Sequence, residues 1–151
     1  MESIANTWAS QLQNSGYRMT KPRQAVLHVI SQTQKSLDPS EILELGRQTC
    51  ASLSLVTVYR TLEKMEQMGF VTRVHQADHC QAFTVGLTGH QHLLICSECE
   101  NVLHFEGDDI HTLVEIIEKQ TGFKIEDHWL QLFGICPACL TKMHDVNKNK
   151  I

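Results

Sequence analysis

The sequence predicts an α+β fold made of two small domains. Apolar residues in the first half recur at the spacing of amphipathic helices, and this half ends in two short strand-like runs. The second half contains short strands around one helix and two C-x-x-C motifs. A chain of 151 residues is long enough for two such domains, each with a modest core. No apolar run has the length of a membrane span, and the N-terminus lacks the pattern of a secretory signal.

Four helices are expected in the first half. In the first of them, Ile4, Trp8 and Leu12 recur at helical spacing. Thr20 is positioned to cap the second helix, and Pro22 suits its first turn because proline has no amide hydrogen that would lack a partner. The apolar spacing of the first helix indicates that it packs through one face, and the start signal at Thr20 and Pro22 marks where the second helix begins.

The third and fourth helices have clearer start signals, and two strands follow them. The segment Asp38-Pro39-Ser40-Glu41 is typical of a capping box, and its helix is expected to reach about Cys50. The next helix spans Leu55–Met68, and the strand-like runs Phe70–Val74 and Gln81–Val85 come after it. Helices followed by a hairpin are the order of a winged helix-turn-helix domain, in which Leu55–Met68 would enter the DNA major groove.

The second half is predicted to be a small α/β domain. Short strands are expected at Leu93–Cys96 and Val102–Phe105, an inward-facing amphipathic helix at Asp108–Gln120, and an alternating strand at Phe123–Ile135. So small a domain buries little apolar surface alone, so a metal or a dimer interface is expected. The predicted divisions are a DNA-binding domain at 1–85, a hinge at 86–92, a dimerisation and metal-binding domain at 93–142 and a flexible tail at 143–151.

The charge distribution separates the two halves. The formal net charge is −4, but residues 1–85 carry a balance of +1 and residues 86–151 a balance of −5. Arginine is the usual side chain for forked contacts to phosphates and guanine edges. The asymmetry favours a nucleic-acid-binding first half, although a chance surface split gives the same numbers. All five arginines lie in that half: Arg18, Arg23, Arg47, Arg60 and Arg73.

Two C-x-x-C motifs are the sharpest signal for a metal site. Cys96 and Cys99 form the first motif, and Cys136 and Cys139 form the second. Two such turns complete a tetrahedral shell of four sulfurs, which suits structural zinc and leaves no position open for a substrate. The alternative is four free or redox-active thiols.

Histidines form a second, less specific set. The chain has nine histidines, and histidine is the commonest neutral metal ligand. His90, His92, His111 and His128 come from three expected elements, and their convergence would build a nitrogen-rich site for zinc, nickel, copper or ferrous iron. The alternative is four ordinary surface or half-buried histidines.

An enzyme of the zinc-dependent deaminase class is a further alternative. His104-Phe105-Glu106 together with the second C-x-x-C motif superficially matches the H-x-E and P-C-x-x-C signatures of those enzymes. However, the proline lies between the cysteines, and deaminase chemistry needs an open coordination position. The sequence therefore favours a protein that is not an enzyme.

Polar and basic residues of the first half are candidates for DNA contacts. Three of them cluster near the start of the fourth helix, where side chains reach base edges or phosphates, and Arg73 would contact the backbone from the hairpin. Solvated surface is the alternative for each residue alone. The candidates are Tyr17, Arg18, Lys21, Arg23, Thr57, Tyr59, Arg60 and Arg73.

These motifs together resemble the ferric uptake regulator family of metal-dependent repressors, and the zinc uptake branch is one candidate within it. The resemblance implies a winged-helix domain, a dimerisation domain, and a cytoplasmic homodimer on palindromic double-stranded DNA with metal as co-repressor. It covers residues from about 8 to 140. The matching segments are Tyr17–Arg23 (YRMTKPR), Val56–Leu62 (VTVYRTL), His90–Cys99 (HQHLLICSEC), Asp127–His128 and Cys136–Cys139 (CPAC).

The resemblance also implies which residues hold metal. The four cysteines match the structural site, and His90, His92, His111 and His128 match a site in which relatives mix histidines with acids. At the hinge sensor, ligand positions of the family fall on Leu37, Thr84, Gln91 and Leu93, and only His104 remains there. The hinge sensor is therefore either absent or rebuilt from His75, His79 and Cys80.

A metal-responsive repressor of metal homeostasis is the function that this resemblance implies. Zinc is the first choice of signal because nitrogen ligands dominate, and ferrous iron is the second. An iron-responsive or peroxide-sensing regulator of the same family is the alternative.

Overall fold

The computed structural model describes residues 3–75, 81–89, 91–107 and 110–148, and it confirms the α+β class. The chain divides into two compact units, Met1–Gly86 and Leu87–Ile151. The first unit contains a two-stranded sheet and the second a three-stranded sheet. Within the described residues, no helix is both long and apolar enough to cross a membrane.

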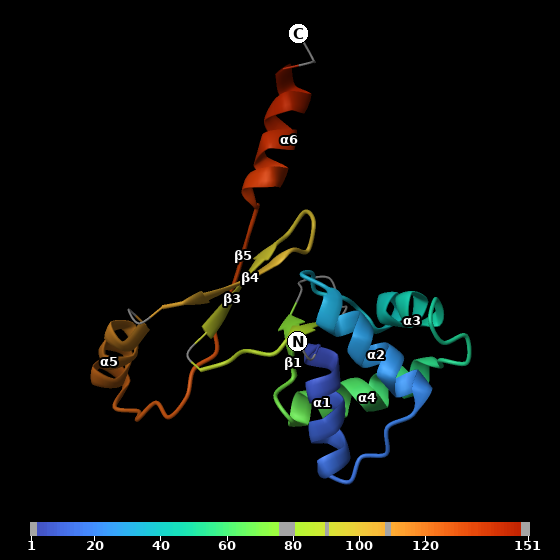
Figure 1. Ribbon diagram of the computed structural model, residues 1–151. Coiled ribbons are helices and arrows are strands. Elements are labelled where there is room, and N and C mark those ends of the chain that lie inside the picture. Colours follow the sequence, from blue (N-terminus) through green and yellow to red (C-terminus); the bar gives the residue numbers. More distant parts are fainter. Residues whose placement is uncertain (1–2, 76–80, 90, 108–109, 149–151) are drawn as a thin grey trace. The chain divides into compact units, whose positions relative to one another are not determined.

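Four helices and a hairpin build the first unit (Figure 1). The strands of the hairpin are antiparallel, and Val71 lies opposite Val85. This is the predicted winged helix-turn-helix order. The elements are α1 (Ile4–Asn14), α2 (Lys21–Gln32), α3 (Pro39–Arg47), α4 (Leu55–Gln67), β1 (Val71–His75) and β2 (Gln81–Val85).

A single apolar core holds these elements together. Each helix contributes the stripe that its periodicity predicts, and the hairpin closes one side of the core. The Trp8 ring stacks on Phe70 with centroids 5.7 Å apart, which ties α1 to the start of the hairpin. The side chains of the core are Trp8, Leu12, Val26, Leu27, Ile30, Leu37, Ile42, Leu53, Val58, Leu62, Met65, Val71 and Phe83.

The helix starts follow the sequence signals at one position and depart from them at another. The Asp38 carboxylate accepts from the Glu41 amide at 2.9 Å, and the Glu41 carboxylate accepts from the Asp38 amide at 2.8 Å, so the capping box is confirmed. Thr20 occupies the N-cap position of α2, but its side chain makes no capping hydrogen bond. Helix α3 ends at Arg47, before the expected Cys50.

The second unit is a three-stranded sheet with two helices. The strand order is β4-β3-β5, in which β3 is antiparallel to β4 and parallel to β5. The parallel pair places Cys96 of β3 opposite Gly134 of β5. The elements are β3 (Gln91–Cys96), β4 (Val102–Glu106), α5 (Ile110–Thr121), β5 (Gln131–Gly134) and α6 (Pro137–Lys148).

Two expectations about the end of the chain are corrected. The alternating run Phe123–Ile135 is a strand only over β5, where Gln131–Gly134 pair with Leu93–Cys96 of β3. Helix α6 (Pro137–Lys148) lies where no helix was expected, and the flexibility expected of 143–151 stays a prediction. Pro137 at the first helical position is the start signal for this helix.

The apolar stripe of α5 does not face inward in the single chain. None of the α5 residues is buried, and Leu113 and Ile117 are 56% and 38% exposed. The expectation of an inward-facing helix is therefore wrong for one chain alone. Exposed apolar stripes of this kind mark interaction sites.

Gly86 belongs to the first unit rather than to a free linker. Its amide donates to the Phe70 carbonyl at 2.8 Å, and a Cβ at this position would lie 2.0 Å from the Gly69 carbonyl oxygen. Only glycine allows such a close backbone approach. The segment 86–92 expected to be a hinge is thus anchored at its first residue, and its last two residues lie in β3.

The capping box of α3 can be tested by substitution. Asp38→Ala removes the acceptor for two helix amides and should lower the free energy of unfolding by about 1 kcal/mol. Chemical denaturation followed by circular dichroism measures the change. Glu44→Ala, on an exposed face of the same helix, should stay within about 0.5 kcal/mol of the parent. Equal effects of the two variants would contradict the capping role.

Candidate metal centres and nucleic-acid interface

The four cysteines of the two C-x-x-C motifs form one cluster. Their sulfur atoms all lie within 4.8 Å of one another, and the Sγ atoms of Cys99 and Cys136 are 3.7 Å apart. Four sulfurs at about 2.3 Å from a tetrahedral zinc would be roughly 3.8 Å apart. The cluster therefore has the size of a four-thiolate zinc shell.

Backbone pairing places the two motifs side by side. Cys96 is the last residue of β3, and the Ser97 amide donates to the Gly134 carbonyl at 2.8 Å. The chain then turns back through Glu100, whose amide donates to the Cys96 carbonyl at 2.9 Å and whose φ is +61°. The second motif enters the first turn of α6 directly after β5. The β3–β5 pair is thus the scaffold of the cluster.

Hydrogen bonds lower the pKa of one thiol of the cluster and raise the pKa of another. The Cys136 amide donates to the Cys96 sulfur at 3.3 Å, and such donors lower the pKa of Cys96 to about 6. A hydrogen bond with the Cys136 sulfur, together with burial, raises the pKa of Cys139 to about 12. Since thiolates are the metal-binding form, the fold already favours one ligand in that form. These residues could hold one zinc ion, with no coordination position left for a substrate.

A pair of histidines forms a second candidate centre. The rings of His92 and His128 are centred 5.3 Å apart, and His92 also packs against Phe105. His92 is 3% exposed, and its Nε2 atom is buried without a hydrogen-bond partner. Two imidazoles on adjacent positions of one tetrahedral metal have ring centres roughly 5 Å apart. The pair could therefore supply two nitrogen ligands.

The other predicted histidine ligands are less clearly placed. His111 is exposed on the first turn of α5. His104 pairs in register with Leu93, so it lies on the sheet face opposite to His92. His90, His79 and Cys80 lie outside the described residues, and His75 is exposed at the end of β1. Among described residues, the cysteine cluster is the one group of three or more metal-ligating side chains.

Two positions that the resemblance assigns to the hinge sensor are occupied by buried side chains of the first unit. Leu37 and Thr84 are both buried. An isolated bridge joins Leu37 to Phe83, with N–H···O distances of 2.9 and 2.8 Å in the two directions. Leu37 and Thr84 are therefore part of the packed fold rather than of a metal site.

The exposed side of α4 matches a nucleic-acid interface. Tyr59 and Val56 are 52% and 60% exposed, and Arg60 is exposed beside them. Val56 was not among the sequence candidates. The sequence feature that could have identified Val56 is its position: it is an apolar residue near the start of the helix but outside the inward-facing stripe. There its side chain could contact a thymine methyl group.

Arg73 is already engaged within the protein. Its Nε donates to the Glu66 carboxylate at 2.7 Å, its Nη1 donates to Gln81, and its guanidinium lies 5.3 Å from the centre of the Phe83 ring. The Glu66 contact raises the pKa of Arg73. This residue joins α4 to the hairpin, a partnership that sequence spacing alone does not show.

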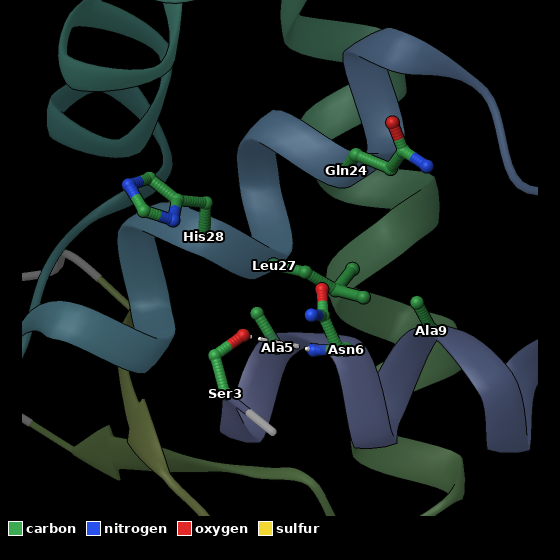
Figure 2. A pocket seen from close by; sticks show the side chains of 7 residues that line it. All are labelled: Ser3, Ala5, Asn6, Ala9, Gln24, Leu27 and His28. Atoms are coloured by element: carbon green, nitrogen blue, oxygen red, sulfur yellow. Dashed lines mark hydrogen bonds between the residues drawn. The ribbon is translucent and has the colours of Figure 1, made fainter. Parts of the chain in front are cut away.

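A pocket of about 270 Å³ between α1 and α2 carries no comparable chemistry (Figure 2). The Ser3 hydroxyl accepts from the Asn6 amide at 3.4 Å and thereby caps α1. His28 lines the pocket without a thiol or carboxylate among the other lining residues. It is therefore not a metal site of the kind formed by the cysteines.

The fold and the cysteine cluster define a class of protein: a winged-helix unit followed by a small sheet unit with a four-cysteine cluster. A sequence model of the ferric uptake regulator family matches residues 14–133. The chain belongs to this family, whose members are metal-responsive transcriptional regulators rather than enzymes. The deaminase alternative is thereby set aside.

Individual relatives agree with this assignment. The ferric uptake regulation protein of Bacillus subtilis is 32% identical over 143 residues, which cover 92% of this chain and 96% of that protein. The structure of a zinc-bound manganese uptake regulator is similar with a TM-score of 0.67 and 27% identity, covering 86% of this chain and 98% of that one. A zinc uptake regulator complexed with zinc and DNA has the same fold, with a TM-score of 0.72, 20% identity and coverages of 93% and 95%.

The cysteine cluster makes a direct prediction about bound metal. Cys99→Ser should lose one equivalent of tightly bound zinc per chain and should lower the melting temperature of the second unit by roughly 10 °C, because metal binding adds to folding stability. Metal analysis after dialysis and differential scanning calorimetry measure the two effects.

Cys50→Ser is the matched control for this variant. The Cys50 thiol lies in the first unit, 3.4 Å from the Ser52 hydroxyl, so its removal should leave the zinc content unchanged. If Cys99→Ser retained as much tightly bound zinc as the parent, the four-thiolate site would be wrong.

Proposed function

We propose that this chain is a dimeric, DNA-binding transcriptional repressor that responds to zinc. The observation that carries the regulatory metal site is the buried Nε2 atom of His92, which lacks a hydrogen-bond partner and lies beside the ring of His128. A buried imidazole nitrogen without a partner is costly, and a bound cation would remove that cost.

The donor set supports zinc over harder metals. His92 and His128 offer nitrogen, and the histidines that match the rest of the set, His90 and His111, would add more of it. Imidazole ligands suit zinc and ferrous iron, whereas carboxylates suit manganese and magnesium. Zinc is the first choice and ferrous iron the second. The cysteine cluster would hold a separate structural zinc.

Helix α4 is the element proposed to enter the major groove. Tyr59 and Val56 are exposed near its first turn, and Ser54 caps it by accepting from the Thr57 amide at 3.3 Å. Arginines of the first unit would contact phosphates on either side. In a homodimer, two such helices would read a palindromic operator. A regulator of this kind would act in the cytoplasm.

Exposed apolar surface of the second unit supports dimerisation. Leu94 pairs in register with Leu103 on one side and Leu132 on the other, so three leucines form an exposed row across the sheet. The stripe of α5, which contains Leu113 and Ile117, is exposed as well. Patches of this kind mark interaction sites, and a second copy of the chain would cover them.

Regulation would then be a shift between orientations of the two units. A bound metal supplies positive charge and a fixed coordination geometry. His92 would hold it from β3 and His128 from the segment before β5, so that two parts of the second unit become fixed to each other. A homodimer in that state would present two α4 helices, one from each protomer, at the spacing of one DNA turn.

A titration of DNA affinity against metals tests the function. The full chain, with its structural zinc in place, is titrated with zinc, ferrous iron, manganese or nickel on a duplex that it selects from a random library. Zinc should tighten binding by about 10- to 100-fold at the lowest free metal concentration. Fluorescence anisotropy measures the affinity.

Other outcomes would contradict the zinc assignment. A response to ferrous iron alone would indicate an iron regulator, and loss of that response after peroxide would indicate a peroxide sensor. The absence of duplex binding under every condition would contradict the DNA-binding proposal itself.

The histidine pair is tested separately. His128→Ala should leave a folded dimer whose DNA affinity changes less than threefold with zinc, because one ligand of the site is missing. His28→Ala removes an exposed histidine of the first unit and should respond as the parent does. A normal zinc response in His128→Ala would show that this residue is not part of the sensor.

The dimer surface makes its own prediction. Leu113→Glu places a charge on the exposed stripe of α5 and should raise the dimer dissociation constant at least 100-fold, as measured by sedimentation or mass photometry. Glu115→Lys, an exposed charge reversal on the same helix, should remain dimeric. A dimeric Leu113→Glu variant would exclude this stripe from the interface.

A further inference from the structure

Arg73 joins the hairpin to α4 through three partners. Its Nε donates to the Glu66 carboxylate at 2.7 Å, and its Nη1 donates to the side-chain oxygen of Gln81. The guanidinium also lies 5.3 Å from the centre of the Phe83 ring. These partners come from the last turn of α4 and from β2, so one side chain of β1 connects three elements of the first unit.

The register of the hairpin places this contact at the edge of the apolar core. Arg73 pairs with Phe83, and Val71 pairs with Val85, so these four side chains share one face of the hairpin. Val71, at the base of the hairpin, and Phe83 both belong to the core of the first unit. A strand advances about 3.4 Å per residue, so Arg73 lies roughly 7 Å beyond Val71. A contact at that distance resists rotation of the hairpin about its base.

The hairpin needs such a contact because its sheet is small. β1 and β2 form a two-stranded sheet, and an isolated two-stranded hairpin is only marginally stable. The β2 strand is attached to the helical part of the unit by backbone hydrogen bonds between Phe83 and Leu37. The Arg73–Glu66 ion pair is the corresponding attachment of β1, made by side chains. Attachment of both strands fixes the angle of the hairpin to the helices.

The electrostatic surroundings of Arg73 are acidic. In addition to the Glu66 carboxylate, the charge of Glu63, one turn earlier in α4, acts on the guanidinium. One cation and two carboxylates leave a local balance of −1. A DNA phosphate is repelled by such a group, because phosphate binding needs cations that are not already neutralised. These surroundings favour an internal role for Arg73 over the expected contact with the DNA backbone.

We propose that Arg73 is a positioning residue, which holds the hairpin at one angle to α4 so that the two elements meet a duplex as one rigid surface. Glu66 and Gln81 orient its side chain, and we call these three residues the Arg73 clamp. Arg73 itself makes no DNA contact in this arrangement. The inference rests on the proposed DNA binding and deepens it, because it separates Arg73 from the arginines that would contact phosphates.

The orientation is measured on the protein alone. Residual dipolar couplings of backbone amides are recorded for α4, β1 and β2 in the full chain. One alignment should fit all three elements in the parent, whereas the couplings of β1 and β2 in Arg73→Met and Glu66→Gln should fall to about half of the values that α4 predicts. The ion pair is partly exposed, so the melting temperature should fall by less than about 5 °C. Lys35→Met removes a cation from an exposed site of the same unit and should keep the single alignment.

DNA binding separates positioning from contact. The zinc-loaded full chain, Arg73→Met and Glu66→Gln are titrated on the selected duplex at several salt concentrations. Both variants should bind about 10-fold more weakly, because a hairpin without a fixed orientation loses more conformational freedom when the duplex binds. The slope of log K against log salt should remain that of the parent, whereas loss of a phosphate contact would reduce it by about 0.9 per protomer.

Exchange of the two charges is the rescue experiment. Combining Glu66→Arg with Arg73→Glu restores an ion pair between α4 and β1, and the Gln81 amide can donate to the exchanged carboxylate. Each single variant should bind at least about 10-fold more weakly than the parent, and the double variant should return to within about threefold of it. If residue 73 faced a phosphate, the carboxylate would make the double variant bind weakly as well.

Three results would overturn the proposal. They are dipolar couplings that fit one alignment in both Arg73→Met and Glu66→Gln, a salt slope reduced by about 0.9 per protomer in Arg73→Met alone, and a charge exchange that does not recover binding. A parent chain that binds no duplex would overturn the proposed function, and the couplings of the protein alone distinguish that result from failure of the clamp.

Discussion

The parallel pairing of β3 with β5 is the contact on which the second unit depends, because it brings the two C-x-x-C turns together. Cys96 lies opposite Gly134 in that pair, and the second turn follows within two residues. The described part of this unit buries few side chains, and Cys96 and Cys139 are two of them. A core of that size contributes only a few kcal/mol. Metal held by the thiolates would add its binding energy directly to the stability of the fold.

The first unit is stabilised in a different way. Four helices and a hairpin enclose a continuous apolar core, and hydrogen-bonded side chains cap α3 and α4. Leu37, at a position where the resemblance places a metal ligand, is part of that core and is bridged to Phe83. Packing and helix caps therefore stabilise this unit without a ligand at Leu37. A metal bound in the second unit would change where the first unit points rather than how it folds.

Local signals in the sequence predicted local structure well. The capping box at Asp38 depends on residues three positions apart, and each C-x-x-C turn is equally local, so both are visible in the sequence. Features that need a distant partner could not be predicted in the same way. The strand before Ile135 needs β3 as its partner, Arg73 is held by Glu66, and the stripe of α5 is exposed in the described part of the single chain.

The contact of Gly86 with Gly69 has a mechanical consequence for reading DNA. The linker leaves the first unit beside the C-terminal end of α4, since Gly69 follows that helix directly. Helix α4 has 13 residues, so its two ends are about 20 Å apart. A tilt of roughly 10° about the linker end would move the opposite end by about 3 Å, close to the rise of one base pair. If α4 reads DNA as proposed, a small rotation of the linker would be enough to take its N-terminal end out of register with the bases.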